Sequence, residues 1–489
     1  MPVSAATSSE TTIDDLPDRP RLSFLSPEKI ERIHQATLEI LDDIGIQVTR
    51  GAAREMLAEA GCRVEKNIVH IPARLVEAAI EAAPKRITIY DRLGEPALAL
   101  GSSAVYTMTG YTDLDFIDLE SGCLRPYTLE DFRHVATVAD ALSNIDIIGH
   151  PGSVRPSASR DAAATNLLEV EAMLTHTSKP LHILVFSSRV LNTCFEMAQA
   201  VTRAQCGASL MEKPFVLPML NPVSPLVFNE DTIDKLLLSV DWGVPVICGP
   251  MPMAGGTSPA TLAGTIAQNN AESLAGLVIA QTRKPGAPYV MITFAVPLDM
   301  RTGDIALGPE ATLLQMGAVE LGQHYGIPVC GSWAGTGYKG FLDVECGWLQ
   351  MLAALAGVVG TTNAGIGIGA GTSLESCVMA DELMGMLKTM MKGIPVNEET
   401  LALDVLREVG PGGGKFMAHP HTLKHAADSW QPRLVPGSGT TDWETLKNRP
   451  IMDRARDRIR TLLQHHRPRP IPAAAREEID AILRRAGVY

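Results

Sequence analysis

The sequence of 489 residues lacks the spacings with which proteins usually hold a metal ion. It contains no His-Glu-x-x-His pattern and no Cys-x-x-Cys pair, and its eight cysteines stand singly along the chain. Cys248 in VPVICGP is one of several that lie within apolar runs, where a buried free thiol is the usual outcome. The sequence therefore predicts neither a zinc site built on cysteines nor a secreted domain held by disulfides.

Long apolar runs and an excess of positive charge are missing as well. The longest apolar run, residues 348–360, is too short and too interrupted to cross a bilayer. Residues 1–21 contain no apolar core of the kind found in secretory signals, and their polar composition predicts a disordered tail. The net charge of −13 disfavours nucleic acid and anionic membrane surfaces as partners. We therefore expect a cytoplasmic protein that binds neither.

The Gly-rich stretch GPGGGKFMAHPHTLKH, residues 410–425, lacks the spacing of a phosphate-binding loop. Only three residues separate Gly410 from Gly414, where such a loop has four, and no Ser or Thr follows Lys415. The same stretch carries three histidines: His419, His421 and His425. They could converge on a metal, but the pattern offers no further ligand on regular structure. We expect them to shape a turn and to cap or pack the adjoining helix, and we predict no metal site.

From residue 104 onward, short apolar runs alternate with amphipathic segments. The eight predicted strands are AVYTMT, NIDIIGHPGS, LHILVFSS, FVLPMLNP, VPVICGPMP, YVMITFAVP, IPVCGSW and the Gly-rich run GVVGTTNAGIGIG. Strand, loop and helix in repeated alternation predict an α/β fold with a parallel sheet and crossover helices. The count of eight favours a closed (β/α)8 TIM barrel over an open sheet. The segment YTDLDFIDLESGCLRP predicts a β-ribbon inserted after the first strand.

A different pattern precedes the barrel. SPEKIERIHQATLEILDDIGI predicts a helix capped by Ser26, with Pro27 at its first position and Gly45 at its end. Further short helices alternate with short strands such as NIVHIP and RITIYD. The sequence therefore predicts a small N-terminal α/β cap region over residues 22–103. The barrel domain follows over residues 104–489 and includes a helical extension at its C-terminal end.

In barrels of this kind the chemistry lies at the carboxyl ends of the strands. The side chains at these predicted ends are His150, Ser153, Ser187, Ser188, Asn221, Met251, Met253, Phe294, Ser332, Trp333 and Asn363. This set is poor in charge, and it contains neither a Ser-His-Asp arrangement nor a pair of carboxylates. A conventional hydrolase is therefore not indicated, and the sequence assigns no catalytic side chain.

Five blocks of the chain resemble the trimethylamine methyltransferase superfamily. They are LSPEKIERIHQATLEILDDIGIQV, IPARLVEAAIEAAPKRITIYDR, NNAESLAGLVIAQTRKPGAPYV, LDMRTGDIALGPEATLLQMGAVEL and EVGPGGGKFMAHPHTLKH. The resemblance extends from about Leu22 to the C-terminus. It implies a (β/α)8 barrel that transfers a methyl group from a methylated amine to the cobalt of a separate corrinoid protein. In this family the last block is a turn before a helix, which favours a structural role for its histidines.

One departure from the family bears on the substrate. The trimethylamine members carry pyrrolysine inside the barrel, whereas this chain has only standard residues, and the corresponding region is SWAGTGYKGFLDVECG. A quaternary ammonium releases a neutral amine when it loses a methyl group, so it needs no pyrrolysine to activate it. Members without pyrrolysine include glycine betaine methyltransferases. We therefore expect a quaternary amine as substrate, glycine betaine first, with proline betaine and carnitine as alternatives.

Binding a quaternary ammonium requires aromatic faces, with or without a carboxylate, in a site that excludes water. The aromatic candidates are Trp333, Tyr338, Phe294 and Tyr111. The polar candidates are Glu310 in GPEATL, Asp343 in FLDVEC, and Asn221 as a hydrogen-bond donor to a betaine carboxylate. Each has an alternative interpretation, because aromatic residues in apolar runs are usually core. Glu310 could also stabilise the first turn of its helix, and Asn-Pro is a common turn signal.

We expect the corrinoid, a cobalamin, on a partner protein. The usual cobalamin-binding loop resembles Asp-x-His-x-x-Gly, and none of the 12 histidines here has an aspartate two residues before it. The run GIGIGAGTSLES could let a flat macrocycle approach its backbone closely. Its candidate contact residues are Gly367, Gly369, Gly371 and Ser373. The alternative is that the last barrel strand turns into its helix here, with Ser373 as the cap.

Three other functions remain open from the sequence. A metal-dependent barrel hydrolase would use the three late histidines, and a non-catalytic protein would bind betaines without transferring their methyl groups. Direct methyl transfer to folate would need no corrinoid partner. Under each of them we expect a protein with a small-molecule ligand, and we expect a homo-oligomer.

Overall fold

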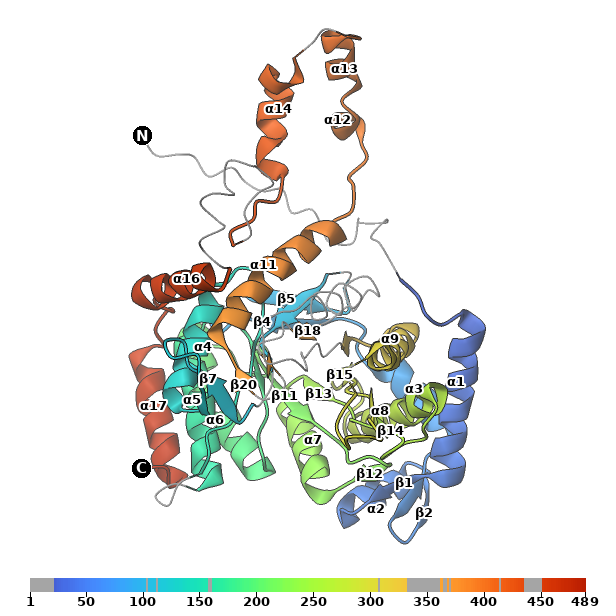
Figure 1. Cartoon of the computed structure of the whole chain (residues 1–489). Helices are drawn as coiled ribbons and strands as arrows, with labels where there is room; N and C mark the ends of the chain where they lie inside the picture. Colours follow the sequence, from blue (N-terminus) through green and yellow to red (C-terminus); the bar gives the residue numbers. More distant parts are fainter. Residues whose placement is uncertain are drawn as a thin grey trace.

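The computed structural model describes residues 22–102, 104–110, 113–156, 161–306, 308–331, 361–363, 367–368, 371–412, 415–434 and 451–489. Within these residues, eight parallel strands form the wall of a barrel (Figure 1). They are β6 (Tyr106–Met108), β9 (Ile148–Gly149), β10 (Leu181–Ile183), β11 (Val216–Leu220), β13 (Val246–Cys248), β15 (Tyr289–Ile292), β17 (Val329–Cys330) and β18 (Thr361–Asn363). Each coincides with a strand predicted from the sequence.

The strands follow one another around the barrel in chain order. A six-stranded sheet runs in the order β17-β15-β13-β11-β10-β9. A parallel bridge from Met108 to Ile147 connects β6 to the β9 segment, and β18 pairs in parallel with β6. Because β18 also lies against β17, the ring is complete. The (β/α)8 barrel predicted from the alternating pattern is therefore confirmed.

Helices follow the strands and surround the barrel (Figure 1). They are α4 (Leu129–Ala141), α5 (Ala162–His176), α6 (Ser188–Cys206), α7 (Glu230–Trp242), α8 (Leu262–Arg283), α9 (Pro309–His324) and α11 (Leu374–Met391). Several begin at a polar N-cap whose side chain accepts a hydrogen bond from the first turn: Thr128, Asp161, Ser187, Asn229 and Ser373. The predicted ribbon after the first strand is also present, as β7 (Asp115–Ile117) paired antiparallel with β8 (Leu124–Pro126).

The first part of the chain packs on the outer side of α8 and α9. It contains α1 (Pro27–Glu39), η2 (Ile40–Ile44), β1 (Ile46–Val48), α2 (Gly51–Glu59), β2 (Arg63–Glu65), β3 (Ile68–His70) and α3 (Ala73–Ala82). The Ser26 side chain caps α1, and Gly45 ends the helical segment with a φ of 78°. The sheet here has the order β12-β1-β3-β2, and β12 (Val227–Phe228) comes from the barrel loop after β11. This shared sheet fastens the N-terminal part to the barrel.

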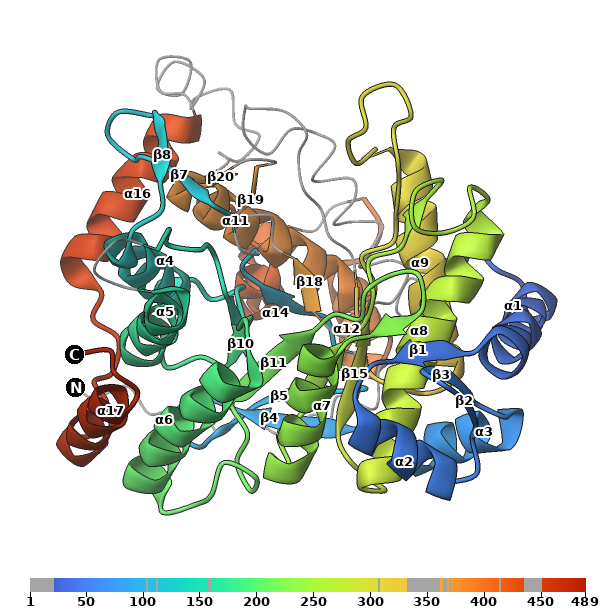
Figure 2. The same cartoon turned by 90° about the horizontal axis from the view of Figure 1, so that it is seen from below.

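A hairpin of β4 (Ile87–Tyr90) and β5 (Pro96–Leu100) closes the amino end of the barrel. Ile89 and Leu98 are buried in one cluster with Leu217 and Val290, which lie near the amino ends of β11 and β15. The backbone amide of Tyr90 also donates to the carbonyl of Pro214, just before β11. In Figure 2 the hairpin lies below β10 and β11, whose arrows point away from it. The opposite, carboxyl end of the barrel is therefore its open mouth.

The last part of the chain leaves the barrel and returns to it. After α11 it forms α12 (Glu398–Leu401), α13 (Leu403–Val409), η3 (Phe416–Ala418), α14 (Pro420–His425) and η4 (Ala426–Asp428). It then returns as α16 (Ile451–His465) against α11 and α4, and α17 (Ala473–Arg485) against α6. Among the helices described, none combines the length and the apolar character that a membrane crossing requires.

Candidate functional site at the barrel mouth

Three neighbouring strand ends are linked at the mouth of the barrel. Asn221 follows β11, and its side-chain Nδ2 donates to the Gly249 carbonyl, just after β13, at 2.8 Å. The Phe294 amide, just after β15, donates to the Pro250 carbonyl at 3.2 Å. These bonds fix Asn221 and Phe294 along one edge of the mouth. An amide nitrogen carries two N–H groups, so the bond to Gly249 occupies one of the two donors of Asn221.

Gly249 allows this edge to be tight. An added Cβ at this position would lie 1.8 Å from the Ile292 carbonyl oxygen, a distance that no side chain can adopt. The absence of a side chain between Asn221 and Phe294 is therefore a requirement of the barrel wall. It also leaves the space above Gly249 to the two flanking side chains.

Phe294 belongs to the barrel interior. Its side chain is 8% exposed and lies in one cluster with Met219, Ile292 and Cys330. The sequence offered two interpretations, a core aromatic and a wall of the cation site. Its position at the carboxyl end of β15, on the interior face, is compatible with both, because one face can pack downward while an edge borders the mouth. Its contact with a substrate stays a prediction.

Glu310 lies in the first turn of α9, with Gly308 as the N-cap and Pro309 at the first position. Its side chain is exposed to solvent. An acid at this place stabilises the helix through the partial positive charge of the helix N-terminus. The structural interpretation of Glu310 therefore has direct support, and a contact with a bound cation stays a prediction.

The glycine-rich run after β18 forms a small hairpin. Gly367 and Gly371 lie in β19 (Gly367–Ile368) and β20 (Gly371–Thr372), which pair antiparallel, and Thr372 pairs with Phe116 of β7. Ser373 is buried and caps α11, while its hydroxyl donates to the Glu375 carboxylate at 2.7 Å. The prediction that Ser373 is a helix cap is confirmed, and any contact between this run and a corrinoid stays a prediction.

Five of the candidates fall outside the residues that the structure describes. They are Trp333, Tyr338, Asp343, Tyr111 and Gly369. Their proposed roles therefore rest on the sequence alone. Of the candidates that the structure describes, Asn221 and Phe294 are each hydrogen-bonded to the strand end of β13, which lies between theirs.

His150 was placed at a strand end by the sequence, but its side chain points away from the mouth. Its Nε2 lies 3.2 Å from the Glu169 carboxylate of α5, and its ring meets the Phe132 ring of α4 edge to face. The amides of Asn166 and Val154 donate to the same carboxylate at 2.8 and 2.6 Å. His150 therefore fastens the strand end to the surrounding helices.

A different histidine, His182 of β10, faces the barrel interior. Its neighbours Leu181 and Ile183 both lie in the outer cluster under the helices, so the alternation of a strand turns His182 inward. Burial, with a smaller effect from nearby His150, lowers the pKa of His182 to about 3, which leaves the ring neutral at pH 7. Sequence analysis missed this residue, although the alternation in LHILV could have indicated it.

The rim of the mouth carries exposed apolar side chains that the sequence analysis did not connect. Phe186 follows β10, Met251 follows β13, and Met300 lies in the loop after β16 (Val296–Pro297). Single exposed apolar residues are common on proteins, but several around one opening are typical of a surface that meets a partner or ligand. In the part of the mouth that the structure describes, Asn221, Gly249 and Phe294 form an edge without charge, and these three exposed apolar side chains lie at the rim.

The three late histidines lie far from this mouth. His419, His421 and His425 belong to the segment that projects beyond α11 (Figure 1). The rings of His421 and His425 are 4.5 Å apart between centroids, and His419 Nδ1 accepts a hydrogen bond from the His421 amide at 3.1 Å. Among the described residues, no group of three or more His, Cys, Asp or Glu side chains is placed to hold a metal ion.

The fold is a (β/α)8 barrel with a plugged amino end, a class in which ligand sites lie at the carboxyl ends of the strands. The family model described as trimethylamine methyltransferase (MTTB) matches residues 4–487, and the chain belongs to this family. The resemblance seen in the five sequence blocks is therefore confirmed. Homologues of this family are methyltransferases, so the chain is a member of an enzyme family.

Individual relatives cover nearly the whole chain. The glycine betaine methyltransferase of Desulfitobacterium hafniense (strain Y51) is 30% identical over 95% of this chain and 96% of its own length. The trimethylamine methyltransferase MttB of Methanosarcina barkeri (strain Fusaro / DSM 804) is 29% identical over 95% of both chains. Among solved structures, the Methanosarcina barkeri monomethylamine methyltransferase (MtmB) is similar with a TM-score of 0.48 and 14% identity, over 94% of this chain and 92% of that one.

Proposed function

We propose that this protein removes a methyl group from a quaternary amine, glycine betaine first, and passes it to the Co(I) of a cobalamin carried by a corrinoid protein. Sequence identity does not distinguish the substrates. The glycine betaine methyltransferase is 30% identical to this chain, and the trimethylamine methyltransferase is 29% identical to it. The substrate class rests on the printed sequence, which contains only standard residues where trimethylamine members carry pyrrolysine.

The observation that carries the proposal is the uncharged edge formed by Asn221, Gly249 and Phe294. In the proposed reaction the N–CH3 bond breaks with its electron pair left on nitrogen, and the pair on Co(I) forms the new bond to carbon. A neutral tertiary amine leaves, and no proton moves. Such a reaction requires orientation of the donor methyl group but neither a general acid nor a general base. The described edge of Asn221, Gly249 and Phe294, none of which titrates, suits it.

The substrate cage that we propose combines described and undescribed residues. Phe294 at the mouth edge, with Trp333, Tyr338 and Tyr111, would supply aromatic faces for the ammonium group. The second N–H of Asn221 would donate to the betaine carboxylate, at a place that its bond to Gly249 already fixes. Asp343 and Glu310 would balance the positive charge from the surrounding loops.

The acceptor protein is proposed to dock on the rim of the mouth. Phe186, Met251 and Met300 expose apolar surface there, and a corrinoid protein would cover it. The run with Gly367, Gly369 and Gly371 would let the macrocycle approach the backbone. This arrangement is proposed for the cytoplasm and for a homo-oligomeric protein.

A spectroscopic assay tests the proposal. The purified protein is mixed with free Co(I) cobalamin and with glycine betaine, proline betaine, carnitine or trimethylamine in separate reactions, and methylcobalamin formation is followed by absorbance. We expect methylation with a betaine and none with trimethylamine. Turnover of trimethylamine alone would overturn the substrate assignment. Betaine binding in calorimetry without any methylation, by free cobalamin or by corrinoid proteins, would indicate a non-catalytic binding protein.

A further inference from the structure

Residues 393–412 and 415–426, which we call the arm, project away from the body of the protein. Figure 1 shows α12, α13 and α14 standing beyond α11, well outside the ring of helices around the barrel. In Figure 2 the same elements lie behind the barrel, whose strands run in the plane of the view. The arm therefore extends sideways from the barrel, and the mouth lies on a different face.

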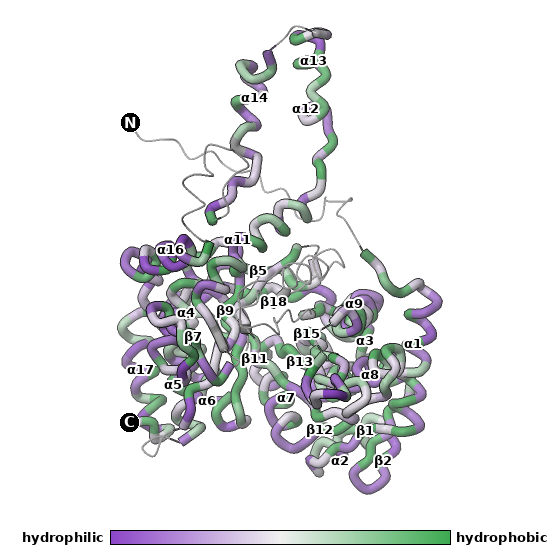
Figure 3. Tube along the Cα trace, viewed as in Figure 1, coloured by the Kyte–Doolittle hydropathy of each residue, from purple (hydrophilic) through white to green (hydrophobic). Residues whose placement is uncertain are grey.

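The arm exposes large apolar side chains on both of its halves. Eight of them have between 46 and 87% of their surface exposed: Ile394, Val396, Leu401, Leu403, Leu406, Phe416, Met417 and Leu423. Figure 3 shows hydrophobic positions along α13 and α14, beyond the helices that surround the barrel. Several exposed apolar side chains on one projecting element are typical of an interaction site.

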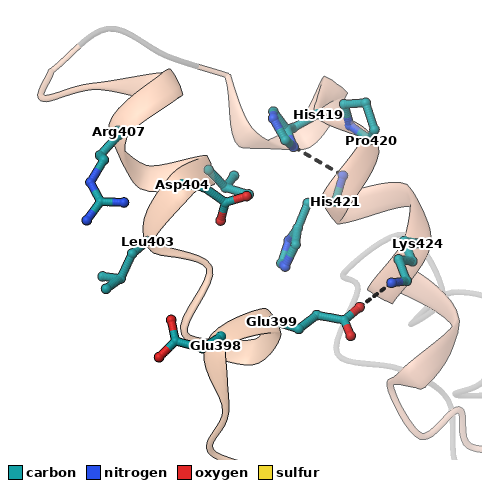
Figure 4. A pocket seen from close by; sticks show the side chains of 10 residues that line it. Glu398, Glu399, Leu403, Asp404, Arg407, His419, Pro420, His421 and Lys424 are labelled. Carbon is teal, nitrogen blue, oxygen red and sulfur yellow. Dashed lines mark hydrogen bonds and ion pairs between the residues drawn. The ribbon is translucent and has the colours of Figure 1, made fainter.

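The two halves of the arm touch each other only weakly. Between them lies a cleft of about 850 Å³, into which His421 and Asp404 point (Figure 4). The contacts across it are polar and exposed, as between Lys424 and Glu399. Among the described apolar residues of the arm, Val405 is the one that is buried.

Helices this short gain little stability of their own. The three helices of the arm contain four, seven and six residues, whereas isolated helices shorter than about 12 residues are marginal in water. Their helical form therefore requires packing that the arm itself does not supply.

We propose that the arm is an assembly element that is buried against a second copy of this chain. The eight apolar side chains together expose on the order of 800 Å², which matches the share of one partner in a standard stable interface. The sideways direction of the arm also separates this surface from the mouth, where the proposed methyl acceptor would dock. An assembly through the arm leaves the mouth of each copy open.

The charge of the arm favours a second copy over a strongly charged partner. The acidic residues of the arm are Glu398, Glu399, Asp404 and Glu408, and the basic ones are Arg407, Lys415 and Lys424. Four acids and three bases give a net charge of −1, whereas the whole chain carries −13. Two copies of the chain repel each other at long range, so they meet most favourably through a nearly neutral element. Both signs of charge on one surface also allow complementary pairs between identical copies.

Sedimentation velocity and native mass spectrometry of the full chain, from nanomolar to micromolar concentrations, test this proposal. We expect a dimer or larger assembly of the unaltered chain. Met417→Asp and Leu423→Asp should each raise its dissociation constant at least about thirtyfold, the effect of losing an interface hot spot. Ile44→Asp is the matched control, because Ile44 is also exposed but lies in the N-terminal part, and its assembly should be unchanged. Unchanged hydrogen exchange in the barrel strands would show that the variants remain folded, whereas the melting temperature should fall with the loss of the assembly.

A second measurement needs no variant. Hydrogen exchange of the unaltered chain should be slower in the arm at micromolar than at nanomolar concentration, while exchange in the barrel strands stays the same. A chain that is monomeric at all concentrations would overturn the proposal, and so would an assembly that survives both arm substitutions. Equal exchange in the arm at the two concentrations would overturn it as well. None of these outcomes depends on the substrate of the mouth.

Discussion

The hydroxyl of Ser224 donates a 2.6 Å hydrogen bond to the carboxylate of Glu272, which lies 48 residues further along the chain. The other oxygen of this carboxylate accepts from the Leu226 amide at 2.8 Å and from Gln268 at 2.9 Å. Glu272 belongs to α8 and is buried, and burial raises its pKa despite these hydrogen bonds. The NNAES block of the family resemblance thus holds the loop that carries β12 into the N-terminal sheet.

Glu272→Ala will lower the free energy of unfolding by about 3 kcal/mol, because it leaves several buried donors without an acceptor. Glu272→Gln is the control for this substitution. Its side-chain oxygen can still accept from Leu226, and Ser224 can accept from its amide, so we expect a smaller loss. Urea denaturation of the three proteins measures the difference. Equal losses in both variants would show that the hydrogen bonds of Glu272 do not stabilise this loop.

His182 will make the protein sensitive to acid. Its pKa falls from 6.5 to about 3 on burial, so the unfolded chain binds a proton in a range where the folded chain does not. Stability therefore falls as the pH drops below about 6.5, and the loss between pH 7 and pH 5 amounts to about 2 kcal/mol. His182→Gln should remove this part of the pH dependence in chemical denaturation.

The control for this prediction is His134→Gln, because the His134 side chain is 40% exposed. Its pH dependence of unfolding should match that of the unaltered protein. If His182→Gln keeps the full loss of stability between pH 7 and pH 5, the neutral interior histidine is not its source.

Trp333→Ala is predicted to weaken betaine binding about thirtyfold. An indole face in a water-free site contributes about 2 kcal/mol to the binding of an ammonium group. Trp333→Phe should restore part of the affinity, because it keeps an aromatic face. Isothermal calorimetry of the three proteins measures the effect, and circular dichroism checks the fold. Equal affinities, or an unfolded alanine variant, would assign Trp333 to the core.

Changing His419 and His421 together to Ala will affect the arm and not the substrate. His419 caps α14 by accepting the His421 amide, and the loss of such a cap costs about 1 kcal/mol. We expect faster hydrogen exchange in α14 and an unchanged dissociation constant for betaine. Metal analysis of the unaltered protein and the double variant tests the alternative. Stoichiometric zinc or iron that is present in the first and lost in the second would support the metal hypothesis.

The sequence predicted the barrel well because its signals are local and repeated. Each strand is a short apolar run followed by a polar cap such as Asn229 or Ser373, and eight repeats of one pattern leave little choice of fold. It also predicted that Asn221 and Phe294 follow strand ends at one mouth, because parallel strands end on the same side of a barrel. Neither inference required knowledge of distant contacts.

The direction of individual side chains could not be predicted in the same way. β9 is two residues long, so the sequence could not show that Ile147 faces inward and that His150 turns outward to Glu169. The arm was also missed as an element, because its helices are too short to show a period and their exposure depends on the direction in which α11 ends. These features depend on packing between segments far apart in the chain.

The β4–β5 hairpin has a consequence for the order of events in the proposed reaction. Ile89 and Leu98 fill the amino end of the barrel, so a small molecule reaches the interior through the carboxyl end. The methyl acceptor would also bind at the carboxyl end. The amine must then enter before the acceptor protein arrives, and the demethylated product must wait until it leaves. If amine and acceptor protein share this entrance, binding is ordered. An excess of acceptor protein would then inhibit turnover, because it would block the entry of the amine.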